Sequence, residues 1–334
     1  MPDNFKIILS RTDSIGDVVL TLPMAGLIKK YFPACTIYFL GRNYTRDVIS
    51  LSEHVDEFVN YDDLENLNLK ERITCLKKIN ADVFVHVFPK KEIAVLAKKA
   101  GTSLRVGTAN RHYHWLNCNQ LIKLSRKNSD LHEAQLNFKL LSFLNINTIV
   151  TTEEITGHYG FSKKPELKKE FQSLIDKDKF NLILHPKSKG SAREWGLFNF
   201  KNLYYALPKT KYKVFVSGTK EDAEQLKDWL KEEPDLIDIC GVMDLKTFIS
   251  FIGACDGLVA ASTGPLHIAA ALGKTTIGLF APMRPIHPAR WKPLGLKAHS
   301  LVLDKNCNEC RNGTTCRCIQ QINAQQVVNL LPVK

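Results

Sequence analysis

Apolar runs short enough for β-strands alternate with helix-like runs twice along this chain, and this alternation limits the possible folds more than any other feature. In the first half the strand-like runs are residues 6–9, 36–40, 57–60, 83–87, 104–107 and 119–121. In the second half they are residues 181–185, 213–217, 237–238, 257–261, 275–280 and 300–303. Strands that alternate with helices form parallel sheets with right-handed crossovers. The sequence therefore predicts an α/β protein with two Rossmann-like, doubly wound domains.

The helix-like runs and one polar stretch predict where the domains meet. Amphipathic spacing predicts helices over residues 25–32, 69–78, 131–144, 198–207, 220–231, 245–254 and 266–272. The lysine-rich stretch 162–179 separates the two halves and could hold a helix around 167–175. A chain of 334 residues suits two domains. We expect an N-terminal domain over 1–161, a linker over 162–179 and a C-terminal domain over 180–334.

Composition predicts the compartment. No apolar stretch approaches the eighteen or so residues of a membrane span. The first residues, MPDNFKIILS, do not resemble a secretory signal peptide. We therefore expect a cytoplasmic protein whose nine cysteines are reduced thiols.

The net charge of +12 suggests an anionic partner. The excess is concentrated in residues 77–139, which carry twelve Lys and Arg but only four Asp and Glu. Such a window is compatible with a phosphorylated substrate, with an anionic membrane surface or with an ordinary solvated face. No nucleic-acid-binding motif accompanies it, so we expect no nucleic acid partner.

The stretch RTDSIGDVVLTLP, residues 11–23, follows the first predicted strand. A helix is expected over residues 18–28, and Gly16 would use turn angles that other residues avoid. Asp17 would then lie at the carboxyl edge of a parallel sheet, where open α/β sheets bind ligands. It could instead be only a helix cap. The turn lacks the glycine pattern of a dinucleotide fold and the ending of a P-loop.

The second half has its own strand-to-helix turn. Ser262, Thr263, Gly264 and Pro265 follow a predicted strand, and His267 lies in the next helical turn. Free N–H groups and the helix dipole make such a start a ready anion site, and a diphosphate suits it. The alternative is a well-capped helix.

Two further loops follow predicted strands in this half. HPKSKGSAREW places Ser188 and Arg193 just beyond the strand at 181–185, among other cations and hydroxyls. These groups suit phosphate, although a solvated basic loop is also possible. Glu221 follows the strand at 213–217, where an acid can bind ribose hydroxyls or simply stabilise a helix start.

Taken together, these stretches resemble the bacterial lipopolysaccharide heptosyltransferases, the sugar-nucleotide-dependent transferases that build the inner core of lipopolysaccharide. The resemblance rests on SRTDSIGDVVLTLPMAGLIKKYFP, RVG, HEAQLNFKLL, HPKSKGSAREW, SGTKED and STGPLHIAAALG, in that order. It implies a GT-B fold, in which two Rossmann-like domains face a central cleft. The acceptor would bind the first domain and the nucleotide the second, and the last helix, around 324–331, would pack back on the first domain.

The resemblance also implies roles for individual residues. Asp17 would be the general base, and Arg193 would assist the leaving diphosphate. The donor-binding residues would be Gly16, Ser188, Glu221, Met243, Ser262, Thr263, Gly264, Pro265 and His267. Arg11 matches a basic position that suits an acidic acceptor, and the basic window adds Lys90, Lys91 and Arg105. The implied reaction inverts the anomeric configuration of the transferred sugar and needs no metal or cofactor.

The implied partners are an ADP-heptose-like donor and an anionic glycolipid acceptor, with peripheral contact at the cytoplasmic face of the inner membrane. One departure from the family pattern leaves the donor sugar open, because Ser262 stands where well-known members carry Asp. In a second departure, Lys189 replaces a common small or hydroxyl residue. Two alternatives therefore remain: a catalytically silent sugar-nucleotide-binding protein, or a sugar-nucleotide epimerase on the same fold. A nicotinamide oxidoreductase is disfavoured.

The C-terminal segment CNECRNGTTCRC contains a C-x2-C pair followed by a C-x-C pair. Its cysteines, Cys307, Cys310, Cys316 and Cys318, could bind zinc through four thiolates. The spacing is shorter than in usual zinc ribbons, so reduced thiols that pack a loop are the alternative.

Overall fold

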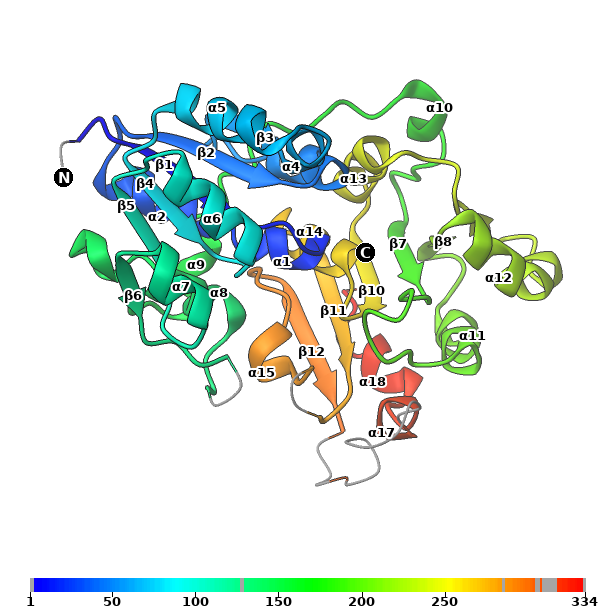
Figure 1. The fold of residues 1–334 in the computed structure, drawn as a ribbon. Coiled ribbons are helices and arrows are strands. Elements are labelled where there is room, and N and C mark those ends of the chain that lie inside the picture. Colours follow the sequence, from blue (N-terminus) through cyan, green and yellow to red (C-terminus); the bar gives the residue numbers. More distant parts are fainter. Residues whose placement is uncertain (1–2, 127–128, 284–285, 304–306, 308–316, 333–334) are drawn as a thin grey trace. The chain divides into compact units, whose positions relative to one another are not determined.

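The computed structural model describes residues 3–126, 129–283, 286–303, 307 and 317–332 (Figure 1). The chain divides into two compact units, Met1–Lys163 and Lys164–Lys334. In the described part of the chain, no helix has the length and apolar character needed to cross a membrane.

The first unit is built on a six-stranded parallel sheet in the order β3-β2-β1-β4-β5-β6. Its strands are β1 Lys6–Ser10, β2 Thr36–Gly41, β3 Glu57–Asn60, β4 Val83–His86, β5 Leu104–Thr108 and β6 Gln120–Ile122. Its helices are α1 Ile15–Val19, α2 Pro23–Tyr31, α3 Arg46–Ile49, α4 Tyr61–Glu65, α5 Leu69–Ile79, α6 Lys91–Lys99, α7 His112–Asn117, α8 Glu133–Lys139 and α9 Thr152–Thr156. Short 3-10 turns form at Asn43–Thr45 and Ser142–Leu144.

The second unit repeats this plan with the sheet order β12-β11-β10-β7-β8-β9, again all parallel. Its strands are β7 Phe180–His185, β8 Tyr212–Val216, β9 Ile237–Asp238, β10 Gly257–Ala261, β11 Thr275–Phe280 and β12 Ala298–Val302. Its helices are α10 Lys169–Gln172, α11 Leu197–Ala206, α12 Lys220–Glu232, α13 Leu245–Ala254, α14 Gly264–Ala271, α15 Pro288–Trp291, α17 Arg317–Gln320 and α18 Ala324–Val328.

The central strands are buried on both faces, as parallel sheets require. Every residue of β10 and β11 is buried, and so are Ile7, Ile8 and Leu9 of β1. Every predicted strand is present, with ends that differ from the prediction by no more than two residues. The predicted α/β class with two Rossmann-like sheets is confirmed.

The strand order tells where each sheet can bind a ligand. In both sheets the chain winds outward in one direction, returns, and winds outward in the other. The order therefore reverses between β1 and β4 in the first sheet and between β7 and β10 in the second. Ligands of open α/β sheets bind at the carboxyl ends of the strands beside such a reversal.

The prediction of one helix over residues 18–28 was wrong. The structure has α1 before and α2 after residue 20, and Pro23 is the first residue of α2. Proline lacks an N–H and suits the first turn of a helix, so it favours a new start there. Gly16 lies within α1 and does not have a positive φ. The predicted need for glycine-only backbone angles at this position was therefore also wrong.

The segment predicted as a linker belongs largely to the second unit, which begins at Lys164. The ring of Phe171 in this segment packs edge-on against Phe251 of α13, with 6.5 Å between centroids. The side chain of Asn181 donates to the carbonyl of Asp176 at 2.7 Å. These contacts attach the segment to the core beside β7.

The last helix, α18, packs against α11 of the same unit. The indole N–H of Trp195 donates to the carbonyl of Ile322 at 2.9 Å. Val327 and Leu331 are buried in the same core as Trp195. The structure thus gives the end of the chain a place in the core of the second unit.

Candidate active site

Arg11 organises the carboxyl edge of the first sheet. It follows β1 directly, is only 3% exposed and forms ion pairs with Asp13 at 2.6 Å, with Asp17, and with Glu133 at 3.2 Å. Burial alone would lower the pKa of Arg11, but the three carboxylates raise it above its usual value. The guanidinium therefore stays charged and holds three acids around one point.

Glu133, in the first turn of α8, is fully buried and shared by two arginines. Arg126 donates to the same carboxylate oxygen as Arg11, at 2.9 Å, and also to the carbonyl of Val87 at 3.1 Å. The sequence analysis did not single out Glu133. Its signal was its helical spacing from the buried residues Leu136 and Leu140, which places a carboxylate on an apolar face.

Asp17 is the third residue of α1 and is oriented from both sides. Arg11 donates to Oδ1, and the Ser14 hydroxyl donates to Oδ2. Ser14, not Asp17, is the N-cap of this helix. Asp17 is therefore not the helix cap. Its side chain remains 17% exposed, and each carboxylate oxygen has a further lone pair that can accept a proton or a hydrogen bond.

Asp13 is the second carboxylate beside Asp17. Burial raises the pKa of Asp13 to about 6, opposed by the charge of Arg11 and reinforced by that of Asp17. Its backbone carbonyl accepts from the Tyr44 hydroxyl at 2.5 Å. The edge thus holds two neighbouring carboxylates that are both paired with Arg11.

The other predicted acceptor residues have different positions. Lys90 follows β4, but its ammonium donates to Glu65 at 2.8 Å and lies 4.2 Å from the centre of the Tyr61 ring. Lys91 is exposed at the start of α6. Arg105 lies near the start of β5, in register with Phe84, and its guanidinium donates to the carbonyls of Thr102, Ser103 and Asn117, the last at 2.8 Å. The structure therefore does not bring Arg105 to Asp17, and Lys90 already has a carboxylate partner.

In the second unit, the loop after β7 carries Ser188 and Arg193. Ser188 is buried, and its hydroxyl donates to the carbonyl of Ala192 at 2.9 Å. Glu194, which the sequence analysis did not single out, accepts from the Ser188 amide at 2.9 Å and from Lys187 at 3.3 Å. Arg193 is partly buried. The loop is therefore held in shape by its own acid.

The loops after β8 and β9 adjoin this one. The amide of Gly241 donates to the carbonyl of Gly218 at 3.0 Å, which joins the two loops. Glu221, at the start of α12, lies 4.0 Å from Lys189 in an exposed ion pair. Met243 is partly buried in the turn before α13. These loops lie close together because they follow the carboxyl ends of neighbouring parallel strands.

The helix that follows β10 offers a start built for an anion. Thr263 is its N-cap, with an extended backbone, and Gly264 and Pro265 open α14. Thr263 is 5% exposed, yet its hydroxyl has no hydrogen-bond partner among the described residues and does not cap the helix. His267 is 2% exposed one turn further on, and Ser262 is partly buried. An anion at this helix start would satisfy both the free amides and the hydroxyl.

His185, the last residue of β7, also lies at this edge, and the sequence analysis did not assign it a role. Its Nδ1 is 2.9 Å from the Ser217 hydroxyl. Burial lowers the pKa of His185 to about 4, so the ring is neutral at physiological pH. Positive charge at this edge therefore comes from side chains such as Arg193 and from the helix start.

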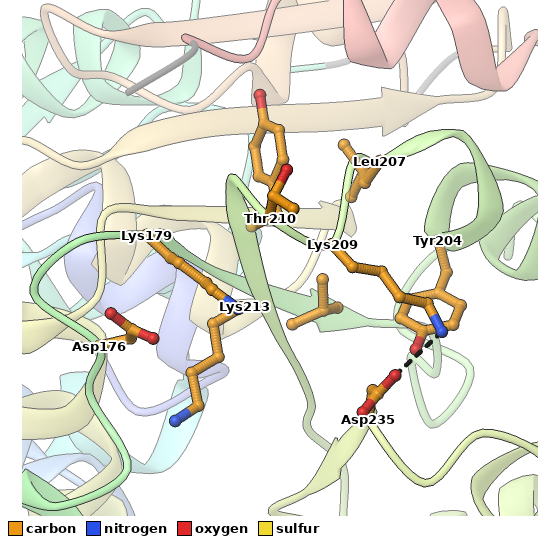
Figure 2. A pocket seen from close by; sticks show the side chains of 10 residues that line it. Asp176, Lys179, Tyr204, Leu207, Lys209, Thr210, Lys213 and Asp235 are labelled. Carbon is orange, nitrogen blue, oxygen red and sulfur yellow. Dashed lines mark hydrogen bonds and ion pairs between the residues drawn. The ribbon is translucent and has the colours of Figure 1, made fainter.

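A separate pocket of about 460 Å³ lies at the opposite ends of the strands, where β7 and β8 begin. Its walls include Lys213 of β8 and Tyr204 of α11, and Lys209 forms a 3.0 Å ion pair with Asp235 beside them (Figure 2). None of the predicted site residues lines it. This pocket is therefore distinct from the candidate site.

The four cysteines that could bind zinc fall partly outside the described residues. Cys310 and Cys316 lie there, whereas Cys307 and Cys318 pack on the core of the second unit. Among the residues that the structure describes, no three His, Cys, Asp or Glu side chains are grouped as a metal site.

Comparison with known proteins decides the family. The sequence profile of glycosyltransferase family 9 (heptosyltransferase) matches residues 74–319. This chain belongs to that family. The match covers the loops of the second unit, whereas Arg11 and Asp17 precede it. The glycosyltransferase activity predicted from the motifs is thereby confirmed.

Relatives extend this likeness over nearly the whole chain. A Haemophilus influenzae protein that carries a provisional glycosyltransferase name is 25% identical over 301 residues, 86% of each chain. The structure of Escherichia coli ADP-heptose lps heptosyltransferase II is similar with a TM-score of 0.72, 17% identity and 98% and 97% coverage. The structure of E. coli heptosyltransferase WaaC with ADP is similar with a TM-score of 0.73 and 15% identity, and the match covers 97% of this chain and 98% of that one. The GT-B fold class is confirmed by these two structures.

Proposed function

We propose that this member of family 9 is an inverting transferase that moves a heptose from an ADP-heptose-like donor to a lipopolysaccharide core or a related anionic glycolipid. Family membership supports the glycosyl transfer. The fold shared with an E. coli heptosyltransferase that was solved with ADP supports the class of donor.

The observation that carries the donor site is the start of α14. Here the Thr263 hydroxyl is buried, and among the described residues it has no hydrogen-bond partner. The loop with Ser188 and Arg193 follows β7, the strand paired with β10, so the two loops flank the reversal of strand order. A nucleoside diphosphate would place its phosphates at the helix start. The loops after β8 and β9, with Glu221 and Met243, would then take the nucleoside.

Asp17 is the proposed general base. Arg11 and Ser14 hold one oxygen each, so the carboxylate is oriented before any substrate binds. In the proposed step, the acceptor oxygen attacks the anomeric carbon and gives its proton to Asp17. The bond between that carbon and the diphosphate oxygen breaks, and the nucleoside diphosphate leaves with the electron pair. Arg193 and the start of α14 stabilise its developing charge.

We place the reaction at the cytoplasmic face of the inner membrane, where a lipid-linked acceptor would be met. The basic window 77–139 of the first unit, with twelve Lys and Arg against four Asp and Glu, supports an acidic acceptor at an anionic surface.

A donor screen tests this proposal. Purified protein is heated with ADP-heptose, with UDP- and GDP-sugars, and with ADP alone, and the melting temperature is recorded. We expect the largest rise with ADP-heptose, and transfer to a lipopolysaccharide-core acceptor with inverted anomeric configuration. Stabilisation without any transfer would instead establish the silent binding protein, for which Ser262 is the best argument. Conversion of the donor sugar without an acceptor would establish the epimerase.

A further inference from the structure

Helix α7 and the edge strand β6 present large apolar side chains to solvent. Trp115 is 59% exposed, Leu116 is 73% exposed and Leu121 is 38% exposed. The indole N–H of Trp115, its only polar group, donates to the carbonyl of Ala109 at 2.7 Å. The exposed part of the ring is therefore purely apolar.

Exposed cations accompany these side chains. Helix α7 packs on α6 (Figure 1), whose last turn carries Lys98 and Lys99. The ammonium of Lys98 donates to the carbonyl of Leu116 at 2.7 Å, so one charge lies beside the exposed leucine. Arg111 precedes α7 and Lys123 follows β6, and both are exposed.

This part of the chain lacks acids of its own. Residues 93–129, which include the end of α6, all of α7 and β6, contain no Asp or Glu. Apolar side chains that include a tryptophan, with cations around them and no carboxylate in the same stretch, suit the boundary between lipid headgroups and acyl chains. The cations would meet anionic headgroups, and the apolar side chains would enter the boundary region.

We propose that the α7 patch, defined as Trp115, Leu116 and Leu121 with Lys98, Lys99, Arg111 and Lys123, docks the protein on anionic lipid bilayers. The docking is peripheral and holds the first unit at the surface. It rests on the proposed function only in supplying a reason for a membrane, namely a lipid-linked acceptor. A second copy of this chain is a poorer occupant, because pairing two such patches would bring like charges together.

The natural fluorescence of the protein can report this docking. Trp195 and Trp229 are 0% and 1% exposed and Trp291 is partly buried, so Trp115 is the most solvent-exposed of the four tryptophans. We expect vesicles of equal parts phosphatidylglycerol and phosphatidylcholine to shift the emission to the blue. Pure phosphatidylcholine vesicles should shift it little. The shift should disappear in Trp115→Phe, which keeps an apolar ring for docking.

Vesicle co-sedimentation measures the affinity. Each basic side chain near an anionic surface strengthens binding about fivefold, so Lys98→Gln with Lys99→Gln should weaken it about 25-fold. Trp115→Ser with Leu116→Ser should weaken it about tenfold or more through lost apolar burial. The matched control is Phe198→Ser, which removes an aromatic residue of the second unit that is 73% exposed, and it should bind like the wild type.

The results that would overturn the proposal are equally definite. One is equal binding by the wild type and both double variants. Another is absence of binding to anionic vesicles together with a concentration-dependent dimer that the Trp115→Ser, Leu116→Ser variant loses, which would make the patch a protein interface. The vesicles contain neither donor nor glycolipid acceptor. A failed transfer assay therefore leaves this test unaffected, and failed docking leaves the transfer assay unaffected.

Discussion

The two sheets of this protein share one strand order, yet their carboxyl edges carry different chemical groups: charged side chains at the first, and backbone amides with a hydroxyl at the second. At the edge of the first sheet, the buried Arg11 is paired with three carboxylates, and Glu133 is shared with a second arginine. At the edge of the second sheet, the start of α14 offers backbone amides and the Thr263 hydroxyl, and His185 is neutral.

This difference suits the two edges to different parts of a transfer reaction. Buried charges hold a carboxylate in one orientation, which suits proton transfer. A helix start offers amides and a dipole to an anion that arrives with the substrate, which suits a diphosphate. The first edge should therefore be sensitive to charge removal within the protein, and the second to the charge of the ligand. The following predictions test that contrast.

The largest effect is expected from Asp17→Asn. The amide keeps the shape of the side chain but is a far poorer proton acceptor, so turnover should fall by about 10²–10⁴-fold while donor binding changes little. Steady-state kinetics and ADP titration separate the two. Asp47→Asn is the control, because Asp47 is also a partly buried Asp in the first turn of a short helix of the first unit. Normal turnover in Asp17→Asn would show that another group is the general base.

Next comes Glu133→Ala, which leaves Arg11 and Arg126 without their shared acceptor. Breaking a buried ion pair from one side costs about 3–5 kcal/mol of folding free energy. Denaturant unfolding should show this loss, and Glu133→Gln should recover part of it by keeping an oxygen acceptor. Turnover at permissive temperature should fall more than acceptor binding, because Arg11, which orients Asp17, loses one of its own carboxylate partners. The exposed Glu153→Ala serves as the control. An equally large loss of folding free energy in that variant would show that the loss in Glu133→Ala does not come from the buried ion pairs.

A smaller effect is expected from Arg193→Ala at the second edge. A charge-assisted contact to phosphate contributes roughly 1.5–3 kcal/mol, so ADP should bind about 10–100-fold more weakly. Adenosine should lose much less. Calorimetric titration of both ligands measures the difference, with Lys201→Ala on α11 as a charge control. Equal losses for adenosine and ADP would show that Arg193 does not contact the phosphates.

The smallest effect concerns Asp13 and pH. Its pKa is raised to about 6 in the folded protein, above its ordinary value of 3.8, so the folded state keeps this proton when the unfolded state has released it. The stability that this group contributes is present below about pH 4 and is lost as the pH rises through 6. Relative to Asp13→Asn, the wild type should therefore lose about 2–4 °C of melting temperature across this window. The exposed Asp178→Asn should follow the wild type, and parallel melting curves for Asp13→Asn would contradict the assignment.

Much of the candidate site was predictable because its residues follow strands directly. Ser188 and Thr263 lie in loops that follow strands, Asp17 and His267 lie in the first turn of the helix after a strand, and the residues of such strand-to-helix connections are visible in sequence. Arg105 was predicted on other grounds, and its role in acceptor binding stays a prediction. A basic residue in a basic window suggests an anionic ligand, but in the structure this guanidinium donates to the backbone carbonyls of Thr102 and Asn117.

The sequence by itself determined the two parallel sheets and the strand-to-helix connections at their carboxyl edges, because hydrophobic periodicity and the residues of tight turns act over a few positions. Only the tertiary structure decided which charges meet. Arg11 and Glu133 lie 122 positions apart and come together because the loop after β1 and helix α8 pack at one edge. Burying such charges is tolerated only when a partner is within reach, and no local pattern records that partner. The exposure of Leu121 was decided in the same way, by the edge position of β6, beyond which no further strand of this sheet is found among the described residues.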